Sequence, residues 1–324
     1  MAVDLSAYHT LVEFANRHKH KMLLDIIKST KQNPLMTDSI WREANDLTKH
    51  TFTRAVSYPT ASVRLLNKGA VPNVGQTQPY DEPVRSFENH VNIDEKYEKL
   101  EKNFAQYRYS EELLHLEGFS RTFMEQFLYG DPSTTLGEIE GLFTRYNDPS
   151  SQDNVHDEGS TTDDQCSSAL MVKWGGDGLF LTYPQGDKNH GINREPRGKV
   201  LLVTDSTTGA QAWFWNTVFT LDFGLCAAKD VAVQRLGSID SSNTVDPDNL
   251  VTMATNIYEE YGSYENVFLY VNGTVFGQMW KENNATPGLL TPSGRKDPWG
   301  NPVWAFNGIP VRLMGGLKNT EDDI

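Results

Sequence analysis

The sequence is poor in cysteine, with only Cys166 and Cys226 among its 324 residues. Two thiols form neither a disulfide framework nor a CxxC pair, so the pattern predicts folding in a reducing compartment. The sequence also lacks any apolar run near the roughly 18 residues that a membrane-spanning helix requires. Its first residues do not follow the charged-then-apolar pattern of a signal peptide. These absences predict a soluble intracellular protein and argue against a secreted or membrane protein.

Positive charge is also scarce. The chain has 29 Lys and Arg residues against 43 Asp and Glu residues, a formal net charge of −14. Nucleic-acid-binding proteins place many basic side chains against phosphates, so this balance argues against general nucleic-acid binding. With 38 % hydrophobic residues the chain can still bury a substantial core.

Recognisable catalytic patterns are missing as well. The eight histidines are scattered and form no HExxH motif, and no GxSxG elbow is present. His18 and His20 lie two residues apart, which on a helix places them on different faces. The sequence Gly175-Gly176-Asp177-Gly178 is typical of a β-turn, because no helix start with phosphate-loop spacing follows it. We therefore predict no catalytic residue, no cofactor site and no metal site.

Two groups of residues leave alternatives open. One is an acidic stretch that could hold a hard cation but lacks EF-hand spacing, so that a solvated loop is the favoured interpretation. It comprises Asp153, Asp157, Asp163 and Asp164. The other is a set of tryptophans that could form the base of a sugar-binding site, although tryptophan side chains more often pack in a core or an interface. It comprises Trp213, Trp215, Trp280, Trp299 and Trp304.

Residues 1–50 are predicted to form a loosely packed arm with helical character, in which Asn33-Pro34 breaks the helix. A cluster within this arm has the densest positive charge in the chain. Its basic members are Arg17, Lys19 and Lys21, a candidate basic contact patch. A solvated helix face and a contact with an acidic neighbour, a scaffold or DNA are equally good interpretations of this patch.

Residues 51–92 are predicted to be extended. β-forming residues recur at period two near Phe52, and Pro and Gly punctuate the rest of the segment. This pattern predicts a long two-armed β-loop with little apolar content to anchor it to a core. A connection of this length is unusual in a compact domain unless it reaches a partner.

A long amphipathic helix is predicted over residues 110–129. Ser110 can cap its N-terminus, and Gly130 followed by Pro132 stops it. Glu111 and Glu112 suit the positive end of the helix dipole. The expected apolar stripe consists of Tyr109, Leu113, Leu116, Phe123 and Phe127.

The remainder alternates strands with one further helix. Asp246-Pro247-Asp248 predicts a helix start and Gly262 its end. Residues 309–312 are predicted to be a last edge strand. The other expected strands are 169–174, 178–184, 200–204, 210–221, 225–233 and 267–271.

Several of these motifs, in this order, resemble the major capsid proteins of tailed phages, most closely those of short-tailed phages of the epsilon-15 type. The likeness spans roughly residues 50–240 and is weaker at both ends. The segments that carry it are Pro59-Thr60 with Arg64, Asn67-Lys68-Gly69 and Pro72; Tyr107 to Glu112; Phe127 to Asp131; Gly141-Leu142 with Arg145-Tyr146-Asn147; Val172 to Gly175; and Phe180 with Tyr183 to Gly186.

The resemblance implies an α+β chain with the Hong Kong 97 phage capsid fold. It implies an N-terminal arm (1–50), an extended β-loop (51–92), a peripheral domain (93–146 plus a late strand in 301–324) and an axial domain (147–300). The loop residues then expected to contact a neighbouring subunit are Pro59, Arg64, Asn67, Gly69 and Pro72.

The same resemblance implies a homo-oligomer of hexamers and pentamers in an icosahedral shell. Such a shell encloses double-stranded DNA without sequence-specific binding, is assembled in the host cytoplasm and has portal and scaffolding or cement proteins as candidate partners. Two alternatives remain, a tail or decoration component of a virion and a carbohydrate-active or carbohydrate-binding protein.

Overall fold

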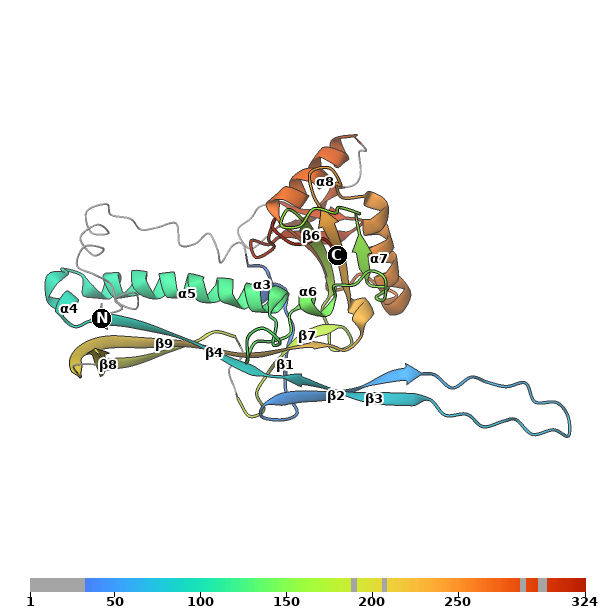
Figure 1. Cartoon of the computed structure of the whole chain (residues 1–324), viewed down its shortest axis with the longest axis horizontal. Coiled ribbons are helices and arrows are strands. Elements are labelled where there is room, and N and C mark those ends of the chain that lie inside the picture. Colours follow the sequence, from blue (N-terminus) through green and yellow to red (C-terminus); the bar gives the residue numbers. More distant parts are fainter. Residues whose placement is uncertain (1–32, 188–190, 206–208, 286–289, 297–301) are drawn as a thin grey trace.

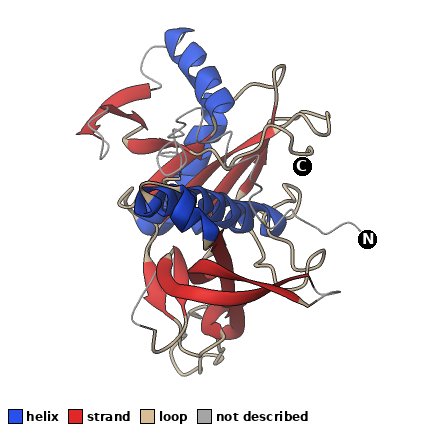
Figure 2. Ribbon diagram, turned by 90° about the vertical axis from the view of Figure 1, so that its left-hand side faces the viewer, coloured by secondary structure: helices blue, strands red, loops and turns tan. Residues whose placement is uncertain are grey.

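The computed structural model describes residues 33–187, 191–205, 209–285, 290–296 and 302–324. In the described residues, the strands form a five-stranded sheet, a seven-stranded sheet and a two-stranded hairpin. A long helix lies between the two larger sheets, as its nearly end-on view in Figure 2 shows. Short helices α3 (Leu35–Asp38), α4 (Lys96–Leu100) and α6 (Leu142–Arg145) connect these parts.

The five-stranded sheet is built around one very long strand, β9 (Ala210–Ala227). The first part of β9 lies between β8 (Asn193–Asp205) and β4 (Arg85–Asp94), and its last residues pair with β7 (Leu179–Tyr183). Strand β1 (Trp41–Glu43) adds to β7 in parallel. The sequence predicted two strands within this region, whereas the chain continues as one strand through residue 227.

The seven-stranded sheet has the order β12-β13-β14-β11-β6-β10-β5. These strands span Leu290–Lys296, Pro302–Phe306, Ile309–Leu313, Val267–Val271, Ser167–Lys173, Val233–Ile239 and Val155–Asp157, in that order. Strand β14 lies between β13 and β11, so the prediction of an edge strand there is wrong. Parallel pairing with β11 holds β14 in this sheet.

Two helices belong to this part of the chain. Helix α7 (Pro247–Tyr261) is capped by Asp246, whose side chain accepts a hydrogen bond from the Asp248 amide, and it ends at Gly262 in the left-handed conformation. The predicted start and end of this helix are therefore confirmed. Helix α8 (Gly273–Ala285) was not predicted, and its first turn receives a side-chain cap from Asn272.

The long helix is α5 (Phe104–Tyr129), with 26 residues. It begins six residues earlier than predicted, because Asn103 caps it by accepting a hydrogen bond from the Gln106 amide. Ser110 lies inside the helix and donates to the Tyr107 carbonyl. The helix ends at Gly130 as predicted. A Cβ atom on Gly130 would lie 2.2 Å from a backbone oxygen, so glycine is required where the chain crosses itself.

The two halves of α5 are packed differently. The C-terminal half buries Phe119, Phe123 and Phe127 in a core shared with both larger sheets. At the other end Tyr109, predicted to lie on the apolar stripe, is exposed. Phe127 stacks on the fully buried Trp174, with ring centroids 6.0 Å apart.

Strand β6 separates two cores. Leu170 and Val172 point into the core that contains α5, whereas Ala169 and Met171 point into the core beneath α7 and α8. Successive side chains of a strand point to opposite faces, so a strand covered on both faces is apolar at nearly every position. This explains the unbroken burial of β6.

The core beneath α5 yields a stability prediction. Phe127→Ala should lower the free energy of unfolding of the unassembled subunit by about 3–5 kcal/mol, because it leaves a cavity against Trp174. The control is Leu136→Ala. Leu136 is 98 % exposed, so this substitution should change the free energy of unfolding by less than about 0.5 kcal/mol. Urea titration measures the free energy of unfolding of both variants. Equal losses in the two variants would contradict the assignment of this core.

Candidate assembly interface

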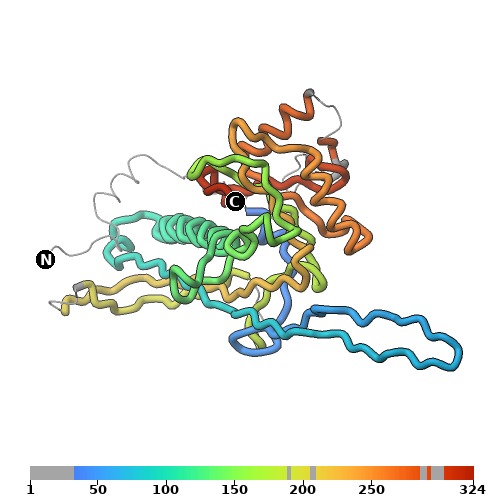
Figure 3. The backbone as a smooth tube through the Cα atoms, turned by 45° about the vertical axis from the view of Figure 1, so that its right-hand side comes forward, coloured from blue at the N-terminus to red at the C-terminus, as the bar shows by residue number. Residues whose placement is uncertain are grey.

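The extended segment is a hairpin that leaves the body of the molecule. Strands β2 (Lys49–Ser57) and β3 (Gln76–Pro83) pair with each other and with no other strand of the described residues. Beyond them residues 58–75 form a strandless tip, the blue arm that projects in Figures 1 and 3. The next strand, β4, which falls in the range predicted for the loop, pairs instead with β9.

The tip (residues 58–75) exposes apolar side chains to an unusual degree. Leu66 is 94 % exposed and Val63 is 91 % exposed. The others are Tyr58, Leu65, Val71 and Val74. Fully burying one such side chain is worth about 1.5–3 kcal/mol, so this surface is costly to leave in water. Contiguous exposed apolar surface of this kind marks interaction sites.

Local contacts give the tip a defined turn. The Lys68 amide donates to the Leu65 carbonyl at 3.0 Å, and Asn67 adopts a left-handed conformation with φ of 65°. The Asn73 side chain donates across the loop to the Thr60 carbonyl at 2.8 Å. All five residues predicted to contact a neighbour, Pro59, Arg64, Asn67, Gly69 and Pro72, lie exposed on this tip.

Charged groups fix the root of the hairpin, its paired strands β2 and β3, to the body of the molecule. The two terminal guanidinium nitrogens of Arg145 donate to the carboxylate of Glu82 in β3, at 2.7 and 2.9 Å. Burial by itself would lower the pKa of Arg145, but the hydrogen bonds and charge of Glu82 raise that pKa above its usual value. Such a two-point ion pair fixes orientation as well as distance.

A second clamp holds β2. Arg54 donates to both carboxylate oxygens of Asp230, at 3.0 and 2.9 Å, and lies 4.6 Å from the centre of the Tyr80 ring. The Tyr146 hydroxyl donates to the same carboxylate at 2.9 Å. The Arg145-Tyr146 pair, singled out in the sequence only through a resemblance, thus fixes both strands of the hairpin.

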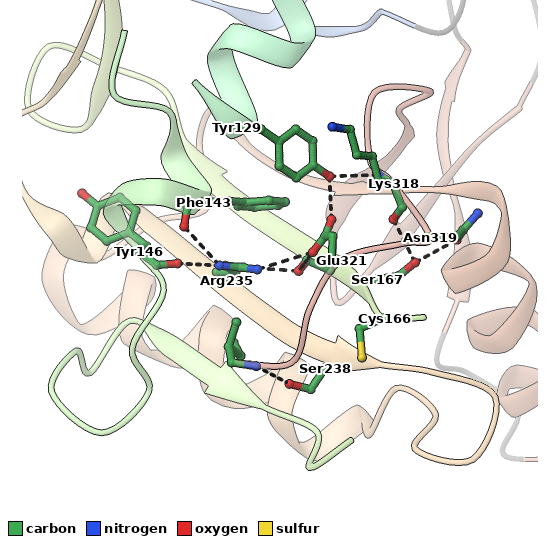
Figure 4. Close-up of polar contacts among 12 residues, drawn as sticks. Tyr129, Phe143, Tyr146, Cys166, Ser167, Arg235, Ser238, Lys318, Asn319 and Glu321 are labelled. Carbon is green, nitrogen blue, oxygen red and sulfur yellow. Dashed lines mark hydrogen bonds and ion pairs between the residues drawn. The ribbon is translucent and has the colours of Figure 1, made fainter. Parts of the chain in front are cut away.

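Tyr146 also belongs to a buried polar cluster that joins distant segments (Figure 4). Arg235 of β10 donates to the carbonyls of Phe143 and Tyr146 at 3.3 and 2.8 Å, and its guanidinium lies 4.2 Å from the centre of the Phe143 ring. The Glu321 carboxylate faces Arg235 at 3.4 Å and accepts from the hydroxyl of Tyr129, the last residue of α5, at 2.6 Å. We call these five residues the clasp.

A buried acid holds the other end of α5 to the sheet. Glu112 accepts hydrogen bonds from Arg108 at 3.0 Å and from Thr217 of β9 at 2.7 Å, and pairs with Arg194 of β8 at 2.7 Å. Its side chain is almost fully buried. The sequence assigned Glu112 to the helix dipole, but the helix begins earlier and this residue binds the sheet instead.

An acidic cleft of about 690 Å³ lies between the hairpin root and the end of α7. Six carboxylates line it, together with the two root arginines, which are already paired. The carboxylates are those of Glu82, Glu140, Asp153, Asp230, Glu259 and Glu260.

Other predicted features lie apart from this region. Among the described residues, no group of three or more His, Cys, Asp or Glu side chains is placed to hold a metal ion, and no helix has the length and apolarity to cross a membrane. Trp280 and Trp304 contact each other with ring centroids 4.7 Å apart, whereas Trp215 packs on Phe104. The basic patch Arg17, Lys19 and Lys21 lies outside the described residues.

The long helix lies between two sheets, and a hairpin projects from one side of the molecule. A solved structure of bacteriophage epsilon15 is similar, with a TM-score of 0.62 and 24 % identity over 89 % of this chain and 88 % of that chain. The bacteriophage JBD30 capsid covers 96 % of this chain and 99 % of its own, with a TM-score of 0.49 and 11 % identity. The likeness to the epsilon15 structure shows that the chain has the Hong Kong 97 phage capsid fold.

Residues 18–324 match the family described as Major capsid protein GP7, and the chain belongs to that family. No curated protein matches the sequence. The protein is therefore a structural protein of the virion, a phage major capsid protein that forms an icosahedral shell from many copies.

The root clamp yields one prediction. Glu82→Gln should lower the free energy of unfolding of the subunit by about 1–3 kcal/mol, because the buried Arg145 guanidinium loses its charged acceptor. The neighbouring Lys49–Asp81 pair is exposed, so Asp81→Asn is the matched control and should cause little measurable change. Urea titration compares the two, and a larger loss in the control would refute the clamp.

The clasp yields a pH prediction. Burial raises the pKa of Glu321, although Ser168, Tyr129 and Arg235 partly offset this. A raised pKa in the folded state stabilises the protein below the ordinary pKa of glutamate, and this contribution is lost as pH rises through the folded-state value. The unfolding free energy of the wild type, relative to Glu321→Gln, should therefore fall between pH 4 and pH 7. Urea titrations across this range would show a constant or rising difference if the assignment is wrong.

Proposed function

We propose that the tip (58–75) builds the shell by burying its apolar side chains on a neighbouring subunit. The observation that carries this proposal is the contrast between a clamped root and an exposed apolar tip. A root fixed by Arg54 and Arg145 aims the tip in one direction, which lowers the ordering cost of binding. The contact residues would include Pro59, Arg64, Asn67, Gly69 and Pro72.

The contact joins different surfaces of two copies, because the tip projects away from its own body (Figure 3). Head-to-tail contacts of this kind close into rings when the rotation between copies allows it. Hexamers and pentamers are the rings we propose, assembled in the host cytoplasm around double-stranded DNA. The net charge of −14 would limit adhesion of the wall to that DNA.

We assign parts of the chain to the regions of such a subunit. The five-stranded sheet and α5 would form the peripheral domain, and the seven-stranded sheet with α7 and α8 the axial domain. The N-terminal arm predicted over residues 1–50 would use Arg17, Lys19 and Lys21 as its basic contact, while residues 41–43 of that range belong to the five-stranded sheet as β1. Portal and scaffolding or cement proteins remain candidate partners.

Deleting residues 67–75 tests the function of the tip. The subunit should stay folded, since these residues lie outside both cores, but closed shells should not form. Circular dichroism and negative-stain microscopy measure the two outcomes. Normal shells from the deletion variant would refute the proposal, and tubes or trimers from the intact chain would favour a tail or decoration component.

A further inference from the structure

Charge is segregated along this chain in two complementary segments. Residues 51–80, which include the tip, contain three basic residues and no acidic residue. Residues 236–280, which include α7, contain six acidic residues and no basic residue. In a protein with a net charge of −14, an acid-free stretch of 30 residues on the most exposed element is a distinctive feature.

Helix α7 presents an outer face that combines acidic and apolar groups. Its inner residues, such as Leu250 and Ile257, are fully buried against the seven-stranded sheet. On the other side Val251 and Tyr258 are 46 % and 50 % exposed, and Asp248 lies one turn from Val251. Residues three and four apart share a helix face, so these groups form one strip.

The acidic cleft continues this strip at the C-terminal end of α7. Asn256, Glu259 and Glu260 belong both to the helix and to the cleft lining. The cationic groups in the cleft lining, Arg54 and Arg145, are bound to the carboxylates of Asp230 and Glu82. Beside the cleft, Lys229 pairs with Glu260, so Glu259 is the helix carboxylate that remains for a ligand. The strip and the cleft together, which we call the α7 surface, are therefore suited to a basic, partly apolar ligand.

We propose that the α7 surface of one copy receives the hairpin tip of a second copy. This inference rests on the proposed function of the tip and adds the surface that it contacts. Lys68 and Arg64 would face the carboxylates around Glu259, and the tip's apolar residues would cover Val251 and Tyr258. The two surfaces belong to different copies, because the clamped root directs each tip away from its own body (Figure 1).

A second exposed apolar region is a poorer acceptor. The end of the β8–β9 hairpin exposes Leu201 and Trp213, and the neighbouring cation Lys199 is paired with Glu95 and Glu98. Across an interface, opposite charges attract and like charges repel. The cleft beside α7 gathers six carboxylates in one lining, so the positive charge on the tip favours the α7 surface.

Crosslinking tests the contact directly. Both native cysteines are buried, and burial raises the pKa of the Cys226 thiol to about 12, so neither should react. Shells carrying Lys68→Cys and Glu259→Cys should give a ladder of covalent multimers with a short bismaleimide reagent on a denaturing gel. Shells carrying Lys68→Cys and Glu195→Cys are the matched control. Glu195 is also exposed but lies on β8, outside the α7 surface, so the denatured subunits should run as monomers. The absence of a ladder in the first pair would overturn the proposal.

Charge exchange gives an independent readout. Lys68→Glu and Glu259→Lys should each reduce the yield of shells about tenfold, and the two together should restore most of it. Glu195→Lys changes net charge equally and should neither reduce the yield nor rescue Lys68→Glu. Microscopy and sedimentation measure the yield.

The outcomes separate the two proposals. Deletion of the tip without effect on assembly would refute the function of the tip itself. Loss of shells on deletion, with normal shells from Glu259→Lys, would leave that function intact and refute the α7 surface. Rescue of Glu259→Lys by reversing Arg17, Lys19 and Lys21, and not by Lys68→Glu, would instead assign the surface to the N-terminal arm.

Discussion

The buried cation of Arg235 connects parts of this subunit that are distant in the sequence. It holds two carbonyls of the α6 segment on one side and the Glu321 carboxylate on the other. Glu321 accepts from the end of α5, while the Tyr146 hydroxyl continues the network to Asp230 and hence to Arg54 of the hairpin. Breaking such a buried pair leaves an uncompensated charge, so the orientation of helix, sheet and hairpin depends on it.

The sequence was sufficient where local rules decide the structure. Asp246 and Gly262 delimit α7 through capping, and the Pro- and Gly-rich loop was visible as a segment without a core. It was insufficient where distant residues meet. Arg54 and Asp230 are 176 positions apart. The sequence around each of them gives no sign that their side chains pair.

The boundary errors have physical causes of the same kind. Strand β9 continues through Gly224, which looks like a break in the sequence. A Cβ there would lie 2.7 Å from the Pro83 carbonyl, so this glycine permits the hairpin root to approach the strand. Ser110 was predicted to cap α5 and the two acids after it to face the helix dipole, yet Asn103 is the cap and Glu112 is buried against β9.

The length of β9 bears on the mechanics of the shell. Helix α5 and β9 both follow the long axis of the subunit in Figure 1. Stretching along that axis would shear β9 against β4 and β8. The many backbone hydrogen bonds between these strands would then have to break at the same time. The subunit should therefore be stiff along its length, and a shell under internal pressure should yield first at the contacts between copies.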